Sequence, residues 1–246
     1  MSPRLSVSKI LEDWKLAFDV DAMYFHAAKQ NYETGVRGFA RVQQAYDNYA
    51  GLEEESERVI GKYRGDTWKA YDELEPLYIQ LESAGSSIGF EYAPVLEAFS
   101  TTHILCAAAL ETHINARSKG LLSGKSWDKF ESMDLETKWL FLPKLAGLEG
   151  FDPGTEPFQS FSKLISFRNR LVHYKERTEP WKPPGVPSFL ADLGLTEKLA
   201  GQSLESVRGM ISGLARRLKE KQPFWLTKST QAANYFSIQI PSKRKS

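Results

Sequence analysis

The chain of 246 residues has one cysteine, four histidines and a formal net charge of only +1. A single cysteine, Cys106, excludes an internal disulfide and a zinc site built from several cysteines. A net charge near zero excludes a global positive field, so any basic surface for a nucleic acid must be local. The start, "MSPRLSVSKILEDW", lacks the apolar core of a signal peptide, and no run of about 18 apolar residues is evident. These absences predict a cytoplasmic protein that does not enter a membrane.

What the sequence does contain is enough apolar material for a folded core. Hydrophobic residues make up 41% of the chain and charged residues 26%, a balance typical of folded soluble proteins. Glycine and proline gather in a few short zones, and between them apolar residues recur at steps of three and four, which favours helices. We therefore predict an all-α fold.

The helical pattern divides the chain into three expected parts. Residues 1–90 are predicted to form an N-terminal helical extension in which two helices make a hairpin. Residues 91–222 are predicted to form a helical bundle, and residues 223–246 a C-terminal tail. Within the tail, "NYFSIQI" has the composition of a short strand, but the sequence indicates no partner strand for it.

Glycine and proline set the expected breaks between helices. "TGVRG" (34–38) is a possible break in the first helix, and Pro76 is expected to kink or split the second. "SAGSSIG" (83–89) is interpreted as a flexible connection between the hairpin and the bundle. The bundle helices are predicted over about 94–118, 132–147, 155–177 and 202–220, with a proline-rich loop over 178–189.

The segment "SFRNRLVHYK" (166–175) places several groups capable of chemistry near the end of one predicted helix. Because each helical residue advances by about 100°, Asn169 and His173 share one face, one turn apart. Both are expected to border an apolar stripe through Ile165 and Val172, whereas a solvated charge run would lie opposite it. Arg168 lies about 140° around the axis from His173. It therefore reaches that face only through the length of its side chain, or from a second chain.

These residue types suit the cleavage of a phosphodiester without a metal ion. Histidine can take and give a proton near neutral pH. Arginine presents a charged planar fork to phosphate oxygens, and asparagine can orient the imidazole or a phosphate oxygen. Attack by the neighbouring ribose 2′-hydroxyl would use His173 as the base and Arg168 to stabilise the transition state, with no cofactor. The simpler alternative is that these side chains only satisfy carbonyl groups and the dipole at a helix end.

The pattern R-N-x-x-x-H, formed by Arg168, Asn169 and His173, resembles the signature of the HEPN superfamily of small α-helical domains. The context is similar as well, and the resemblance covers roughly 95–220, about half of the chain. It implies an HEPN-like helical bundle with an N-terminal helical hairpin extension. The segments that carry this wider resemblance are "AAALETHINARSK" (107–119), "WLFLPKL" (139–145) and "LESVRGMISGLARRL" (204–218).

The resemblance also implies an activity and an assembly. Many HEPN domains are metal-independent endoribonucleases that form homodimers, with the motif helices of two chains facing each other across the site. Arg168 and His173 would then be the catalytic pair, and Asn169 the polar residue beside the arginine. The implied partners are RNA, a second copy of the chain, and a possible antitoxin or regulatory protein. The implied setting is toxin-like or antiviral defence.

Further residues are candidates for binding the substrate or supporting the site. An acidic residue on an earlier helix sometimes supports sites of this family, which makes Glu111 a candidate, with Asn115 one turn further along. Arg170, Lys175 and Arg177 would place positive charge at the mouth of the cleft. Two alternatives stay open. One is a non-catalytic HEPN-like interaction or nucleotide-binding module, and the other is an all-α scaffold whose motif match is accidental.

Overall fold

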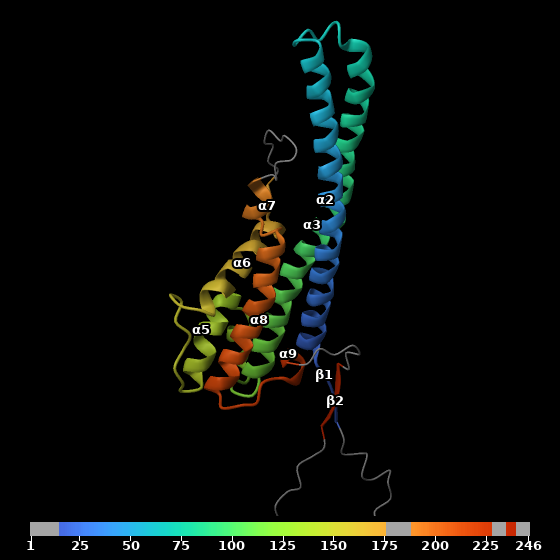
Figure 1. The fold of residues 1–246 in the computed structure, drawn as a ribbon. Coiled ribbons are helices and arrows are strands. Elements are labelled where there is room, and N and C mark those ends of the chain that lie inside the picture. The colour runs from blue at the N-terminus through green and yellow to red at the C-terminus, as the bar shows by residue number, and fades with distance from the viewer. Residues whose placement is uncertain (1–14, 176–187, 228–234, 240–246) are drawn as a thin grey trace, which may run out of the picture.

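The computed structural model describes residues 15–175, 188–227 and 235–239. Within them the chain is helical apart from its turns and one pair of short strands, which confirms the predicted all-α class at that coarse level. Two long helices, α2 (Val20–Lys62) and α3 (Tyr71–Ser118), form an antiparallel hairpin whose tip projects beyond the other helices (Figure 1). The shorter helices gather around the half of the hairpin that is remote from this tip.

The predicted break at 34–38 is wrong, because its two glycines lie in the middle of α2 and face α3. A Cβ at Gly35 would lie 2.5 Å from Cε1 of Phe99, and one at Gly38 would lie 2.8 Å from Cγ2 of Val95. The missing side chains therefore let the two helices approach closely. This packing offsets the loss of helix propensity, roughly 1 kcal/mol per glycine.

The predicted flexible connection at 83–89 is also wrong, since these residues form part of α3. Ala84 and Ile88 lie one turn apart and are buried, and Ile88 packs in a cluster with Val42 and Tyr46 of α2. Nor does Pro76 divide the helix, because α3 runs without interruption through it and through a second proline. The expected boundary near residue 90 therefore falls inside one continuous helix.

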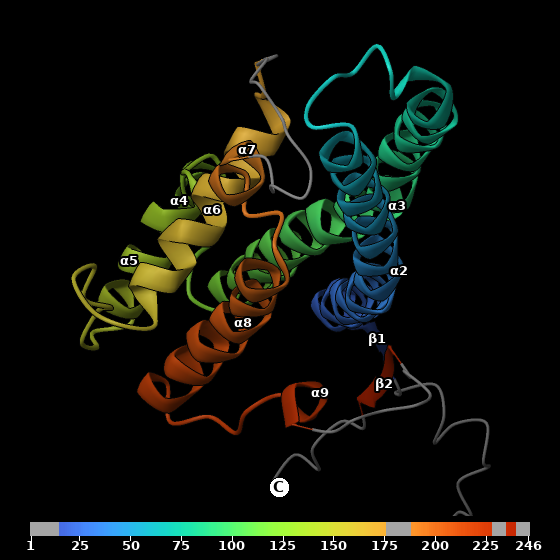
Figure 2. The ribbon, with the colours of Figure 1, turned by 45° about the horizontal axis from the view of Figure 1, so that its top comes forward.

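The core of the bundle lies between the second half of α3 and the helices that follow it. In both views α5 and α6 lie on one side and the α2–α3 hairpin on the other, with α8 between them (Figure 1 and Figure 2). Trp139 and Phe161 are fully buried in this core, and so is Cys106, as expected for a structural thiol. Burying one such aromatic side chain contributes about 1.5–3 kcal/mol. The helices concerned are α4 (Lys125–Glu131), α5 (Leu135–Leu145), α6 (Phe158–Val172) and α8 (Glu197–Arg217).

Local capping sets where two of these helices begin. Asp134 is the N-cap of α5, and its carboxylate accepts from the backbone N–H of Thr137. Thr196 caps α8 by accepting from the N–H of Leu199. For this reason α8 begins at Glu197, earlier than the predicted helix over 202–220.

The candidate strand near the C-terminus is confirmed, and its partner is the segment before α2. The strands β1 (Lys15–Phe18) and β2 (Phe236–Gln239) pair antiparallel, with Phe18 opposite Phe236. The pairing lies beside α9 (Phe224–Thr227), at the end of the molecule opposite the hairpin tip (Figure 1). The part of the predicted loop at 178–187 lies outside the described residues, and its last two residues begin α7 (Ser188–Asp192).

By length and composition, α3 alone among the described helices is apolar enough to cross a membrane, with an 18-residue window of mean hydropathy 1.3. This window includes polar residues, so it does not contradict the expectation that the sequence contains no run of about 18 apolar residues. Half of the window is buried inside the fold, and a core helix passes the same composition test. Its apolar residues pack against α2, α6 and α8.

Candidate functional site at the end of α6

The helix α6 ends at Val172, and His173 is its C-cap residue instead of lying in a longer helix to residue 177. The backbone N–H of His173 still donates to the carbonyl oxygen of Asn169 at 2.9 Å. The predicted spacing of one turn between these two residues therefore holds. Both side chains are exposed, so both are accessible to a substrate or to another chain.

The prediction of an apolar stripe through Ile165 and Val172 is wrong at Val172. The core face of α6 is formed by Phe158, Phe161 and Leu164, whereas Val172 is 54% exposed. Near the end of the helix it is Leu171 that packs against the cluster containing residues of α7. Because Val172 points about 100° away from Leu171, it lies outside this contact. His173 therefore does not border a buried seam within this chain, whereas Asn169 lies beside Ile165, which packs against the core.

Two grooves meet at Asn169. The α3 groove, of about 420 Å³, lies between α3, the start of α5 and α6, and includes Arg168 and Asn169. The α6 groove, of about 490 Å³, continues along α6 and includes Asn169 and His173. Glu136 and Ile165 also line both grooves. Arg168 and His173 thus lie on either side of Asn169 and do not line a common groove.

The guanidinium of Arg168 is held by its neighbour. Nη1 of Arg168 donates to Oδ1 of Asn169 at 3.0 Å. This bond engages the acceptor atom of the amide and leaves the Nδ2 amino group of Asn169 as a donor. An incoming phosphate oxygen would therefore meet donors from both side chains.

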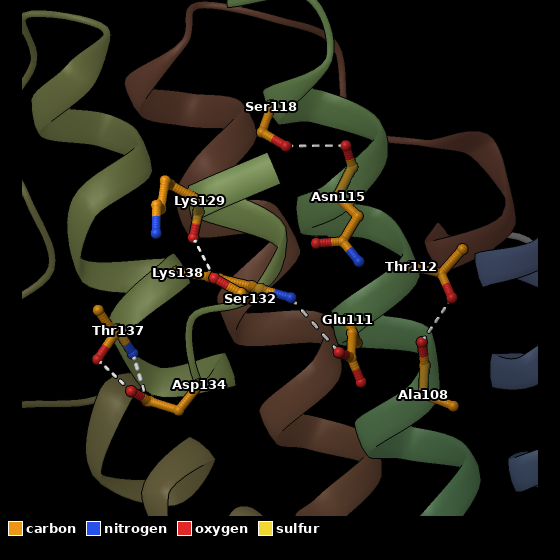
Figure 3. A network of polar contacts seen from close by, with 10 residues as sticks. All are labelled: Ala108, Glu111, Thr112, Asn115, Ser118, Lys129, Ser132, Asp134, Thr137 and Lys138. Atoms are coloured by element: carbon orange, nitrogen blue, oxygen red, sulfur yellow. Dashed lines mark hydrogen bonds and ion pairs between the residues drawn. The ribbon is translucent and has the colours of Figure 1, made fainter. Parts of the chain in front are cut away.

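Glu111, a candidate through the family resemblance, lies on α3 and lines the α3 groove together with Arg168. Its Oε1 is 3.5 Å from Nζ of Lys138, a lysine of α5 whose side chain is only 2% exposed (Figure 3). The sequence did not single out Lys138, because lysine is rarely buried. The sequence nevertheless contained a signal for its position, since Leu135, Lys138 and Leu142 follow the three- and four-residue spacing of the buried face of α5.

Asn115 is not brought to this groove. It lies on α3 one turn beyond Glu111 (Figure 3) and is absent from the groove lining. Its Oδ1 is buried and has no hydrogen-bond partner in the part of the chain that the structure describes. The structure therefore separates Asn115 from Arg168, although Asn115 lies close to the Glu111–Lys138 pair.

The other predicted cations lie next to the grooves. Arg170 lines the α6 groove, and its Nη1 donates to the carbonyl oxygen of Asp192 at the end of α7, at 2.8 Å. Lys175 lines a smaller hollow of about 200 Å³, which Arg170 and His173 also border. Arg177 lies outside the described residues. Arg170 and Lys175 thus extend the positive charge away from Arg168, towards α7.

Carboxylates that the sequence did not single out for the site dominate the α3 groove. Asp134 and Glu136, at the start of α5, line it together with Glu111. Hydrogen bonds from Thr137 to Asp134 hold the pKa of this carboxyl below its usual range, so it stays ionised. Arg168 is the one cation among the residues that line the described groove. One chain therefore presents a groove with excess negative charge, beside a helix end that is positive.

No family model, no curated protein and no solved structure matches this chain. The basis for a function is therefore the chemistry of these side chains and the resemblance of the motif.

Proposed function

We propose that the chain is a metal-independent endoribonuclease whose site is completed by a second copy of the chain. The observation that carries this proposal is the arrangement around Asn169, with Arg168 along one groove and His173 along the next. All three motif side chains reach the surface, which a purely structural role would not require. Their residue types and spacing match the HEPN signature.

The chemistry follows from the side chains. His173 takes the proton of the ribose 2′-hydroxyl and returns a proton to the leaving 5′-oxygen. Arg168 stabilises the charge that develops on the phosphate oxygens. Asn169 holds the guanidinium through its Oδ1, and its amino group is available to the phosphate. The products are a 2′,3′-cyclic phosphate and a 5′-hydroxyl.

Charge complementarity and exposed apolar surface both favour the pairing of two copies of the chain. The carboxylates of the α3 groove are complementary to the cations around the end of α6. In a two-fold dimer each chain would therefore place its α6 end against the partner's groove. Ile104 and Met133 line the α3 groove and are nevertheless 43% and 37% exposed, which leaves apolar area for such a contact. The assembly would also gather two arginines and two histidines around one strand of RNA.

The biological setting belongs to the same proposal. By its resemblance to the HEPN superfamily, the chain acts in the cytoplasm as a toxin-like or antiviral-defence nuclease. A protein antitoxin would hold it inactive by blocking the access of RNA to the site.

The experiment is RNA cleavage in the presence of EDTA. The wild-type protein should convert an end-labelled RNA to fragments with 2′,3′-cyclic phosphate ends, and His173→Ala and Arg168→Ala should each lower the rate by about 100-fold or more. Lys163→Ala, which removes an exposed cation from the same helix, is the matched control. Cleavage that persists in His173→Ala, or no cleavage by the wild type on any RNA tested, would refute the proposal.

The excess of carboxylates in the α3 groove favours a second candidate, a non-catalytic module that binds a nucleotide or a protein. In that case RNA stays intact, and Arg168→Ala changes the binding of a labelled nucleotide without any change in cleavage. The same set of variants therefore separates the two candidates.

A further inference from the structure

A separate pocket lies at the end of the molecule opposite the hairpin tip, where α2 begins and α3 ends (Figure 1). This base pocket has a volume of about 510 Å³, within the usual range for small-molecule sites. It shares no lining residue with the α3 groove or the α6 groove. Its chemistry is therefore independent of the proposed nuclease site.

A buried histidine with one available ring nitrogen lines the base pocket. His113 is 4% exposed, its ring is stacked on Trp139, and Nδ1 lies 2.7 Å from Oδ2 of Asp21. Since a carboxylate only accepts, Nδ1 carries the hydrogen, and Nε2 of the neutral ring is an acceptor. Among the described residues none makes a hydrogen bond to Nε2. His113, a lining residue, thus has an acceptor atom that no described residue uses.

A second acceptor is Asp19, which precedes α2. Its backbone N–H donates to the carbonyl oxygen of Tyr235, but its carboxylate does not cap the helix and makes no hydrogen bond within the described part of the chain. Partial burial raises the pKa of this carboxyl, and the charge of Asp21 raises it further. Two neighbouring carboxylates, Asp19 and Asp21, therefore repel each other at the pocket.

The nearby cation, Arg117, does not neutralise the charge of Asp19 and Asp21. Nη1 of Arg117 lies 2.8 Å from Oε2 of Glu220, so its charge is matched by that partner. Three aromatic side chains also line the pocket: Phe18 and Phe224 are about half exposed, and the ring of Trp225 contacts that of His113. The base pocket combines negative charge, hydrogen-bond acceptors and aromatic faces.

We propose that the base pocket binds an organic cation, a guanidinium or alkylammonium group. Such a group donates hydrogen bonds to Asp19 and to Nε2 of His113, and its charge relieves the repulsion between the two carboxylates. The aromatic walls add cation–π attraction and cover the apolar part of the ligand. An anion would be repelled by the two carboxylates and would have no cation–π attraction to the aromatic faces.

The same cationic group can come from a free small molecule or from an arginine side chain of a protein, and titration calorimetry of the full chain distinguishes them. One arm uses agmatine, and the other uses the peptide acetyl-Gly-Arg-Gly-amide. Tighter binding of the peptide assigns the pocket to a protein side chain, whereas equal or tighter binding of agmatine assigns it to a small molecule.

The decisive variant is Asp19→Asn, which removes the charge of a side chain that makes no hydrogen bond in the described fold. We expect it to weaken binding of both probes by about fivefold or more. The control Asp72→Asn removes an exposed carboxylate at the hairpin tip and should leave binding unchanged. The proposal is overturned by binding of neither probe at about 10 mM, by equal affinity in Asp19→Asn, or by equally tight binding of inorganic phosphate. These outcomes do not depend on whether the chain cleaves RNA.

Discussion

The guanidinium of Arg168 is hydrogen-bonded to the side chain of the next residue, with Nη1 donating to Oδ1 of Asn169 at 3.0 Å. Successive helical residues point about 100° apart, so the arginine side chain must turn back towards its neighbour to make this bond. Asn169 consequently determines where the positive charge lies, between the α3 groove and the α6 groove. Its role in the proposed reaction is to position Arg168.

Asn169→Ala should release the guanidinium and lower kcat for RNA cleavage by about 10- to 100-fold with little change in KM. Because Asn169 is exposed, the free energy of unfolding should change by less than about 0.5 kcal/mol. Steady-state kinetics and urea unfolding measure the two effects. Asn48→Ala, at an exposed position of α2, is the control. An unchanged kcat in Asn169→Ala would contradict the positioning role.

Ile104→Arg should dissociate the proposed dimer, since it places a cation in the apolar part of the α3 groove. Ile104 is partly exposed, so the fold of the single chain should survive. Sedimentation velocity should show a shift from dimer to monomer, and RNA cleavage should fall with it. Ile79→Arg, at a more exposed apolar position on the hairpin, should leave both unchanged. A variant that stays dimeric would show that the contact lies elsewhere.

Glu111 and Lys138 should show strong thermodynamic coupling. Glu111→Ala leaves the ammonium of Lys138 buried without its carboxylate and should destabilise the protein by about 2–3 kcal/mol. Lys138→Met replaces the ammonium with an apolar chain of similar length and should change stability by less than about 1 kcal/mol. The double variant should then be about as stable as Lys138→Met alone. Denaturant unfolding of all four proteins measures the coupling, and additive effects would argue against it.

His103 should make stability depend on pH. Nε2 donates to the carbonyl oxygen of Gly194, which leaves Nδ1 to accept from the hydroxyl of Ser203, both at 2.8 Å. Burial lowers the pKa of His103, opposed in part by the bond to Gly194. Protons therefore bind more tightly to the unfolded chain. The stabilisation is complete above about pH 6.5 and is lost as the pH falls through the folded pKa.

The measurement is urea unfolding of wild type and His103→Gln at pH 5, 6, 7 and 8. The wild type should lose stability between pH 7 and pH 5, and the slope should be smaller in the variant. His173→Gln, at an exposed position, serves as the control for a histidine outside the core. An identical slope in His103→Gln would assign the effect to other groups.

Gly35→Ala should destabilise the protein by about 1–3 kcal/mol, because the added Cβ would collide with the ring of Phe99. Gly51 lies in the same helix, and a Cβ there would meet nothing within 4 Å. Gly51→Ala should therefore stabilise the protein by about 0.5–1 kcal/mol through helix propensity alone. Denaturant unfolding of both variants measures the difference. Stabilisation in both would show that Gly35 has no packing role.

The sequence predicted the features of the fold that depend on local periodicity. It failed for features that depend on contacts between residues far apart in the chain. The helices α5 and α8 were predicted over 132–147 and 202–220 from the spacing of their apolar residues, which is local information. Gly35 and Gly38 suggested a break because their packing partners, Phe99 and Val95, lie some sixty residues away in the chain. Local propensity could not show that a second helix would cover them.

The candidate site shows the same division. The one-turn spacing of Asn169 and His173 followed from helical periodicity, whereas Glu111, which lines the same groove as Arg168, was a candidate only through the family resemblance. The burial of Lys138 did not, because it results from the packing of α5 on α3 and contradicts the usual exposure of lysine. The exposure of Val172 was missed because α6 ends there, and apolar spacing does not reveal where the covering helices stop.

The continuity of α3 has a mechanical consequence. A helix of this length is a rod of about 70 Å. It extends from Tyr71 near the hairpin tip, past Glu111 in the α3 groove, to His113 in the base pocket. No loop interrupts the helix, so a force applied at the tip is transmitted along it to the α3 groove and to the base pocket. A partner that grips the distant end of the hairpin would exert torque on the α3 wall of the groove without touching it.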